Sequence, residues 1–193
     1  MHKPWLPEGV HWGLTITHED RPDAGDFAAG DPKLVWHTTE GTSFEGARQT
    51  LISNHDEPHC LVSVDGRHVV QFVPFDRSSK SLLHPAGTPE TNRAHCIQVE
   101  VCGFAHDSHN WTDDKYKRLA ALAALIEHRT GIERHTHVRW ASEVRRIAPT
   151  HFARTAGHVG HMHVPNNDHV DPGQGFRITD LFHFMGEAER KYQ

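Results

Sequence analysis

The segment from residue 112 to residue 131 is the feature that most constrains the fold, because it encodes one amphipathic helix. Thr112, followed by two aspartates, predicts an N-cap, and Gly131 predicts the helix end. The large apolar side chains between them fall on one stripe, formed by Tyr116, Leu119, Leu122, Ala123 and Ile126. A helix with one apolar stripe must bury it against another element. We therefore expect this helix to cover a sheet.

Four segments have the pattern of strands for that sheet. Residues 33–37 (KLVWH) form an apolar run that ends on a histidine, and residues 60–64 and 68–73 flank an Asp-Gly dipeptide typical of a hairpin. Residues 95–102 (HCIQVEVC) alternate apolar and polar side chains, which predicts a half-buried strand. The sheet should have at least these four strands.

Three further helices are expected. Thr42 and Glu45 form a capping-box pattern that begins a helix ending near residue 54. Shorter patterns predict helices at residues 142–147 and 179–190. The sequence therefore predicts an α/β fold with a mixed central sheet flanked by helices.

The chain reads as one domain. Its 193 residues contain no internal repeat and no Pro/Gly/Ser linker, and this length is ordinary for one domain. Residues 1–32 are rich in Gly, Pro and Asp, so we expect an irregular lead-in packed on the domain formed by residues 33–193.

Composition excludes several classes of partner. The net charge is −5, and 20 Lys and Arg are scattered among 25 Asp and Glu, which argues against nucleic-acid binding. The longest apolar run, residues 119–126, is too short for membrane insertion. The first 13 residues lack the apolar core of a secretory signal, so we expect synthesis in the cytoplasm without a signal peptide.

The three cysteines do not predict a disulfide framework. Cys96 and Cys102 lie six residues apart on one expected strand, roughly 20 Å apart, which is beyond disulfide reach. Pairing of Cys60 with either stays open, although a reducing compartment disfavours it.

Histidine is unusually abundant, with 20 copies, so any fixed spacing of two histidines recurs by chance. The loop at residues 160–173 is more informative because it combines His161 with Asp171, and both residue types bind zinc well. A catalytic zinc site typically uses three protein ligands, and His37, at the end of an expected buried strand, is the natural third. His158 and His163 are the alternatives to these ligands.

Four motifs in order resemble the type-2 N-acetylmuramoyl-L-alanine amidases, the superfamily that includes phage amidase endolysins and peptidoglycan recognition proteins. They are His-Thr-Thr-x-Gly at residues 37–41, a hairpin from His to Asp-Gly at 59–66, Cys-Ile-x-Val-Glu-x-x-Gly at 96–103, and Gly-His followed by Asp-Pro-Gly within 160–173. The resemblance covers about residues 34–176 and includes the ten-residue interval from His161 to Asp171. It implies the single-domain fold of this superfamily, with residues 33–193 as a zinc amidase catalytic domain.

The resemblance also implies roles for single residues. His37, His161 and Asp171 would bind one Zn²⁺, Glu100 would act as general base, and His169 would stabilise the oxyanion, a position at which some family members have lysine. Substrate contacts are expected from His84, whose Leu-His-Pro-Ala-Gly context departs from the family's His-Ala-Gly, and from His59 and Thr38. Without the resemblance, His37 could be a core histidine, Asp171 a turn residue, Glu100 a solvated strand charge and His169 an exposed loop residue.

The implied function is hydrolysis of the amide between the muramic acid lactyl group and L-Ala of peptidoglycan. The partner is therefore peptidoglycan or a muropeptide, and we expect a monomer. The interpretation we favour is a phage endolysin that reaches the cell wall after holin-mediated release, because the lead-in and the His-rich loop are typical of phage amidase domains. The alternatives are a non-catalytic peptidoglycan-binding module of the same fold and a cytoplasmic amidase that recycles anhydro-muropeptides.

Overall fold

The computed structural model describes residues 4–82, 91–140 and 145–192. In these ranges the strands form one seven-stranded sheet in the order β1-β2-β5-β4-β6-β3-β7. Strands β4, β6, β3 and β7 run parallel. The strand bounds are β1 (Gly9–His11), β2 (Leu14–His18), β3 (Lys33–Thr38), β4 (Cys60–Val62), β5 (His68–Gln71), β6 (Cys96–Val101) and β7 (Gly157–Gly160).

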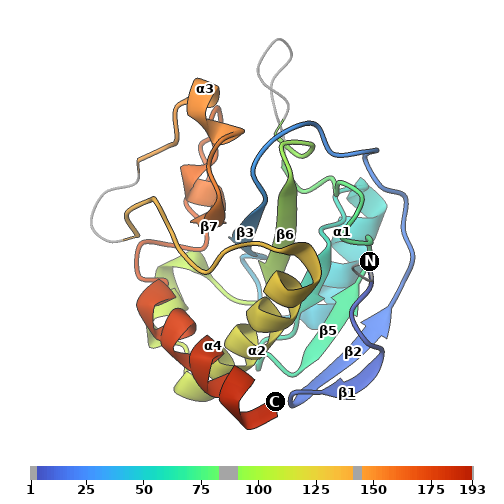
Figure 1. Ribbon diagram of the computed structural model, residues 1–193. Helices are drawn as coiled ribbons and strands as arrows, with labels where there is room; N and C mark the ends of the chain where they lie inside the picture. The colour runs from blue at the N-terminus through green and yellow to red at the C-terminus, as the bar shows by residue number, and fades with distance from the viewer. Residues whose placement is uncertain (1–3, 83–90, 141–144, 193) are drawn as a thin grey trace.

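Helices cover both faces of this sheet. On one face α2 (Asp113–Thr130) and α4 (Ile178–Tyr192) lie side by side, as Figure 1 shows, and close the largest apolar core over Leu34, Trp36 and Val99. The other face carries α1 (Phe44–Asn54), whose Leu51 and Ile52 pack on Leu61 and Val70. The remaining helical segments are α3 (Pro149–Phe152) and the 3₁₀ helices η1 (Ala105–Asn110) and η2 (His161–His163). The predicted α/β fold is confirmed.

The helix ends follow from local chemistry. Thr112 caps α2 by accepting a hydrogen bond from the Lys115 N–H, and Gly131 ends the helix in the left-handed conformation. Helix α1 is capped by Ser43, one residue later than the capping-box pattern begins. The last predicted helix is confirmed as α4 with slightly wider bounds. Of the helix expected at 142–147, residues 142–144 lie outside the described ranges, and 145–147 are not helical.

The predicted hairpin around Asp65-Gly66 is confirmed, since β4 and β5 pair antiparallel with Cys60 opposite Gln71. All three cysteines are buried, and none of them forms a disulfide within the described residues, so Cys60 makes no such pair there.

Two sequence-based expectations are wrong. Residues 9–18 do not belong to an irregular lead-in, because β1 and β2 form a hairpin and β2 pairs with β5, which buries Leu14 and Ile16 completely. Strand β6 is buried along its whole length rather than on one face. It lies between β4 and β3 with packed layers on both faces, so its polar side chains Gln98 and Glu100 point into the protein interior.

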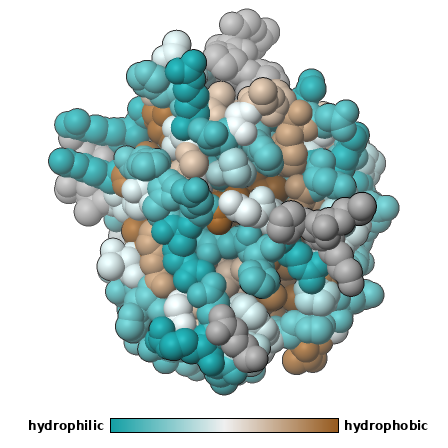
Figure 2. All heavy atoms as spheres, in the orientation of Figure 1, coloured by the Kyte–Doolittle hydropathy of each residue, from teal (hydrophilic) through white to brown (hydrophobic). Residues whose placement is uncertain are grey.

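The surface is mainly polar. On the face shown in Figure 2, hydrophilic residues predominate and hydrophobic ones lie in small groups between them. None of the described helices is long and apolar enough to cross a membrane.

Candidate metal centre

The strand register brings the predicted metal ligands together. Strand β3 lies between β6 and β7, and all three run parallel, so their carboxyl ends meet at one edge of the sheet. Trp36 pairs with Gly160, and the next residues, His37 and His161, therefore come side by side. Asp171 enters from the loop after η2. The sequence predicts that these three residues converge, and the structure brings them together.

The three side chains form a compact and buried cluster. His37 Nδ1 and His161 Nδ1 are 3.1 Å apart, and these atoms lie 3.6 Å and 3.3 Å from the carboxylate oxygens of Asp171. In the part of the chain that the structure describes, this is the group of His, Cys, Asp or Glu residues that could hold a metal ion. Ligand atoms about 2.0–2.2 Å from a tetrahedral zinc lie roughly 3.3 Å from each other, so the cluster fits zinc.

Backbone contacts hold Asp171 in place. The Thr38 N–H donates to its Oδ2 at 3.3 Å, and its own carbonyl accepts a hydrogen bond from the Met162 N–H at 2.8 Å. The glycines near it allow close packing. A Cβ on Gly160 would lie 2.6 Å from Pro172, and one on Gly173, where φ is +90°, would lie 2.0 Å from the Ala105 carbonyl oxygen. Larger residues at either position would push the ligand loop away from the sheet.

The protonation states of the cluster suit a cation. Burial, and then the nearby His161, lower the pKa of His37 to about 3, so its ring is neutral at neutral pH. Burial alone would raise the pKa of Asp171, but hydrogen bonds from His161 and His169 bring it well below the usual value. Metal ligands must be deprotonated, and these two groups already are.

Glu100 lies beside the cluster. It pairs with His37 across β3 and β6, and its Oε1 is 3.6 Å from His37 Nδ1. Its other oxygen, Oε2, is buried without a hydrogen-bond partner. Burial, followed by the charges of Asp171 and Glu40, raises the pKa of Glu100 well above its usual value. A carboxyl group with a raised pKa can both hold and release a proton near neutral pH.

His169 lies on the solvent side of the same cluster. Its Nδ1 is 3.2 Å from Asp171 Oδ1, its ring stacks on His161 with centroids 4.0 Å apart, and its side chain is 49% exposed. The hydrogen bond to Asp171, together with the charges of Asp171 and Asp168, raises the pKa of His169 and favours its protonated form. His169 can therefore donate a hydrogen bond toward the open side of the cluster.

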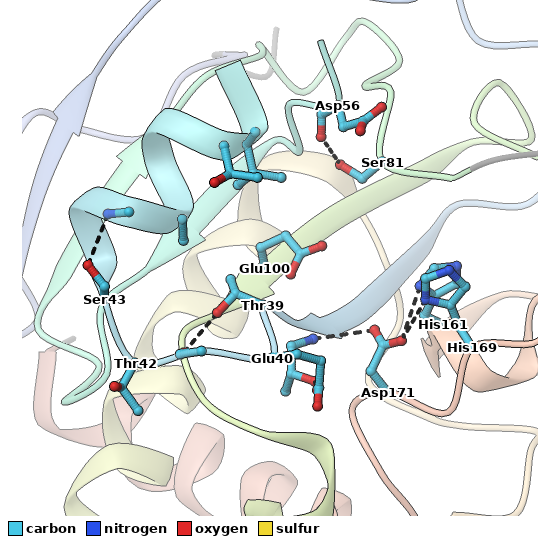
Figure 3. Close-up of a pocket in the computed structure, with 16 residues that line it drawn as sticks. Thr39, Glu40, Thr42, Ser43, Asp56, Ser81, Glu100, His161, His169 and Asp171 are labelled. Carbon is cyan, nitrogen blue, oxygen red and sulfur yellow. Dashed lines mark hydrogen bonds and ion pairs between the residues drawn. The ribbon is translucent and has the colours of Figure 1, made fainter. Parts of the chain in front are cut away.

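A cavity of about 610 Å³ opens in front of these groups and extends over α1. In Figure 3, His161, His169 and Asp171 lie together at one end, Glu100 lies between them and α1, and Ser43 and Asp56 lie farther along. Thr38 also lines the cavity, as its predicted role in substrate contact requires. The cavity therefore connects the candidate metal centre to a groove large enough for an extended ligand.

The other predicted site residues lie elsewhere. The expected substrate contact of His59 is wrong, because His59 is fully buried and both ring nitrogens bond to the backbone, Nδ1 to the Gln98 N–H and Nε2 to the Arg77 carbonyl. His84 lies outside the described residues. The alternative ligands are also engaged away from the cluster, His158 with Trp36 and Glu127, and His163 with the backbone of Gly160 and Arg139.

Sequence reasoning missed Arg146, which binds the ligand loop, the segment between His161 and Asp171, through its guanidinium group. Its guanidinium donates to the carbonyl oxygens of Met162 at 3.1 Å, His169 at 3.2 Å and Asn167. All three carbonyls belong to the loop between His161 and Asp171. No spacing marks this arginine in the sequence, because its partners are backbone atoms.

Comparisons with known proteins agree with this geometry. Residues 31–174 match the model of a family described as N-acetylmuramoyl-L-alanine amidase. The crystal structure of the Staphylococcus aureus hydrolase AmiA in complex with its ligand superposes with a TM-score of 0.61, at 15% identity over 93% of this chain and 87% of that chain. A selenomethionine AmpD derivative gives a TM-score of 0.57, at 21% identity over 93% and 98%. At these identities the two structures show the fold. No curated protein sequence matches the chain.

Proposed function

The chain belongs to the N-acetylmuramoyl-L-alanine amidase family, and we propose that it is a zinc hydrolase that cuts the amide between the muramic acid lactyl group and L-Ala of peptidoglycan. The observation that supports zinc most strongly is the buried cluster of His37, His161 and Asp171. Two imidazoles and one carboxylate that leave a position open to a cavity are typical of catalytic zinc rather than structural zinc.

In this proposal His37 and His161 bind the ion through Nδ1, and Asp171 binds through its carboxylate. When bound, zinc supplies a Lewis acid for the amide carbonyl and lowers the pKa of water. The three ligands are held by β3, by the first residue of η2 directly after β7, and by the loop after η2, so they need little rearrangement to bind the ion. A preorganised site of this kind keeps the reacting groups in register.

Glu100 is the proposed proton carrier. It takes a proton from the attacking water and later gives it to the departing L-Ala nitrogen, a cycle that its raised pKa suits. His169, whose protonated form is favoured, donates a hydrogen bond to the oxygen that becomes negative when the carbonyl is attacked. Both groups face the cavity. Thr38 lies beside them as the proposed substrate contact.

A non-catalytic peptidoglycan-binding module is the alternative, and the presence of Glu100 beside a complete ligand set argues against it. A module that only binds glycopeptide has no need of a buried carboxylate with an unsatisfied oxygen, which is destabilising in itself.

For the biological setting we propose a phage endolysin that acts on the cell wall after release through a holin pore. The His-rich loop from Asn166 to Gly173 supports this setting over recycling of anhydro-muropeptides. Activity on intact cell walls would agree with it, whereas cleavage of soluble anhydro-muropeptides alone would contradict it.

The test of the chemistry is mass spectrometry of peptidoglycan digested by zinc-loaded and chelator-treated protein. We expect new L-Ala amino termini and intact glycan strands with zinc, and loss of cleavage after chelation or in H161A. A matched control is H183A, which removes an exposed histidine of α4 and should leave cleavage unchanged. Cleavage that survives chelation, or zinc bound without amide cleavage, would contradict the proposal.

A further inference from the structure

The metal-facing nitrogen of His37 is Nδ1, so the ring proton of the neutral side chain must sit on Nε2. Nδ1 faces His161, Asp171 and Glu100 at 3.1 to 3.6 Å. Nε2 points the other way, into the protein, where it is fully buried. A ligating histidine usually donates its second N–H to an oxygen that fixes the tautomer and the direction of the ring. His37 Nε2–H therefore needs a buried oxygen as its acceptor.

Gln98 supplies the matching oxygen. Its Oε1 is buried and, like His37 Nε2, has no other hydrogen-bond partner among the described residues. The two side chains project from the same face of adjacent strands, since Gln98 pairs with Val35 and His37 pairs with Glu100. A hydrogen bond with the Gln98 side chain also raises the pKa of His37 against the larger effect of burial. A buried donor and a buried acceptor, each otherwise unpaired, thus face each other.

The orientation of the Gln98 amide is set by Asn92. The Leu82 N–H donates to Asn92 Oδ1 at 2.9 Å, and Asn92 Nδ2 donates back to the Leu82 carbonyl at 2.5 Å. Because a backbone N–H can only donate and a carbonyl can only accept, Asn92 cannot be turned over. Its Oδ1 also accepts from Gln98 Nε2 at 2.8 Å. The amide nitrogen of Gln98 is therefore committed to Asn92, which leaves Oε1 as the group that faces His37.

We propose that Gln98 is a positioning residue that keeps the His37 ring proton on Nε2, so that Nδ1 is unprotonated and aimed at the metal, with Asn92 holding the Gln98 amide in the required orientation. This inference rests on the proposed zinc centre. Neither Gln98 nor Asn92 belongs to the proposed ligand set or to the residues that line the cavity. The proposed chain of hydrogen bonds runs from the Leu82 backbone through Asn92 and Gln98 to His37.

A purely structural role for Gln98 makes a different prediction. If Gln98 only fills space and satisfies Asn92, an apolar residue of similar size would lower stability without changing the His37 tautomer or the affinity for zinc. If it positions His37, the tautomer and the affinity both change, even in a variant that stays folded.

The experiment compares the wild type with Q98M, which keeps the length but lacks the acceptor, and with Q98E. Burial keeps the carboxyl group introduced in Q98E neutral, so that one oxygen can accept from His37 Nε2 while the O–H donates to Asn92 Oδ1. Long-range ¹H–¹⁵N correlation spectra of the metal-free proteins report the tautomer of His37, and competition with a chromophoric chelator reports zinc affinity. We expect an Nε2–H ring in the wild type and Q98E, mixed tautomers in Q98M, and zinc binding about 10 to 100-fold weaker in Q98M. Q49M, at a surface position of α1, is the matched control.

Wild-type zinc affinity together with an unchanged Nε2–H ring in Q98M would overturn the proposal, as would a Q98E protein as weak as Q98M. Thermal unfolding of each variant shows that the comparison is made between folded proteins. Failure of the zinc proposal is distinguishable, because it would appear as absent zinc binding in the wild type, while the tautomer in the metal-free protein still tests Gln98.

Discussion

Glu100 is the residue at which burial and catalysis conflict most directly. Its carboxyl group is surrounded by Asp171 and Glu40, and one oxygen has no hydrogen-bond partner. We expect E100Q to keep the shape and the zinc affinity of the site but to lose roughly 10²–10⁴-fold in kcat, because an amide cannot carry the proton. Initial rates on solubilised peptidoglycan and the bound zinc per protein are the measurements. E187Q on α4 should retain the wild-type rate, and an E100Q enzyme that matches it would remove Glu100 from the mechanism.

At the residue scale, sequence alone identifies groups whose roles are set by local spacing or strand position. His161 and Asp171 lie on one loop, ten residues apart, and His37 ends an expected strand, so the sequence pattern predicts all three as metal ligands. His59 could not be placed in this way. It comes directly before β4, and the sequence does not show whether a residue there lines a cleft or is buried. His59 is buried because its ring nitrogens bond to the Gln98 N–H of β6 and to the Arg77 carbonyl. Gln98 was missed for the same reason, since its partners come from distant parts of the chain.

At the scale of elements, the ligand loop depends on Arg146. One guanidinium binds three carbonyls of the loop, which a lysine ammonium cannot copy with the same geometry. We expect R146A to release the loop, to weaken zinc binding, and to lower the free energy of unfolding by about 1.5–3 kcal/mol, the usual range for one charge-assisted hydrogen bond. Hydrogen exchange of residues 162–171, chelator competition and urea unfolding are the measurements. R67A is the control because Arg67 is largely exposed. If the loop amides of R146A exchange as slowly as those of R67A, Arg146 does not hold the loop.

The same scale shows which elements a single sequence can predict. Helices α2 and α4 and the β4–β5 hairpin were predictable because caps, apolar stripes and an Asp-Gly turn are local signals. The β1–β2 hairpin was not, because β2 owes its place to parallel pairing with β5, about fifty residues away. The full burial of β6 likewise depends on which strands flank it. Pairing between distant segments is the information that local patterns lack.

At the scale of the whole molecule, the histidines in the described part of the chain include a metal cluster, exposed residues and a buried structural set. Three members of the buried set bond to fixed partners outside the cluster, and composition could not have distinguished them from ligands. They are His59, His158 and His163. Burial lowers the pKa of all three, to about 4 for His59 and His163. These rings therefore stay neutral in the folded protein at pH values where an exposed histidine is charged.

This difference makes stability depend on pH. The unfolded chain binds protons on His59 and His163 near pH 6.5, whereas the folded protein does so only near pH 4, so the unfolded state holds more protons between these values. The lowered pKa of His158 acts in the same direction. Their stabilising effect is complete above about pH 6.5 and is lost as the pH falls toward 4. We expect the free energy of unfolding to drop between pH 7.5 and pH 5 by on the order of 1–2 kcal/mol per buried histidine. Urea unfolding with a chelator present measures this without metal release, and H183Q, which alters an exposed histidine, should show the same slope. Equal stability at pH 7.5 and pH 5 would mean that these rings accept protons in the folded state.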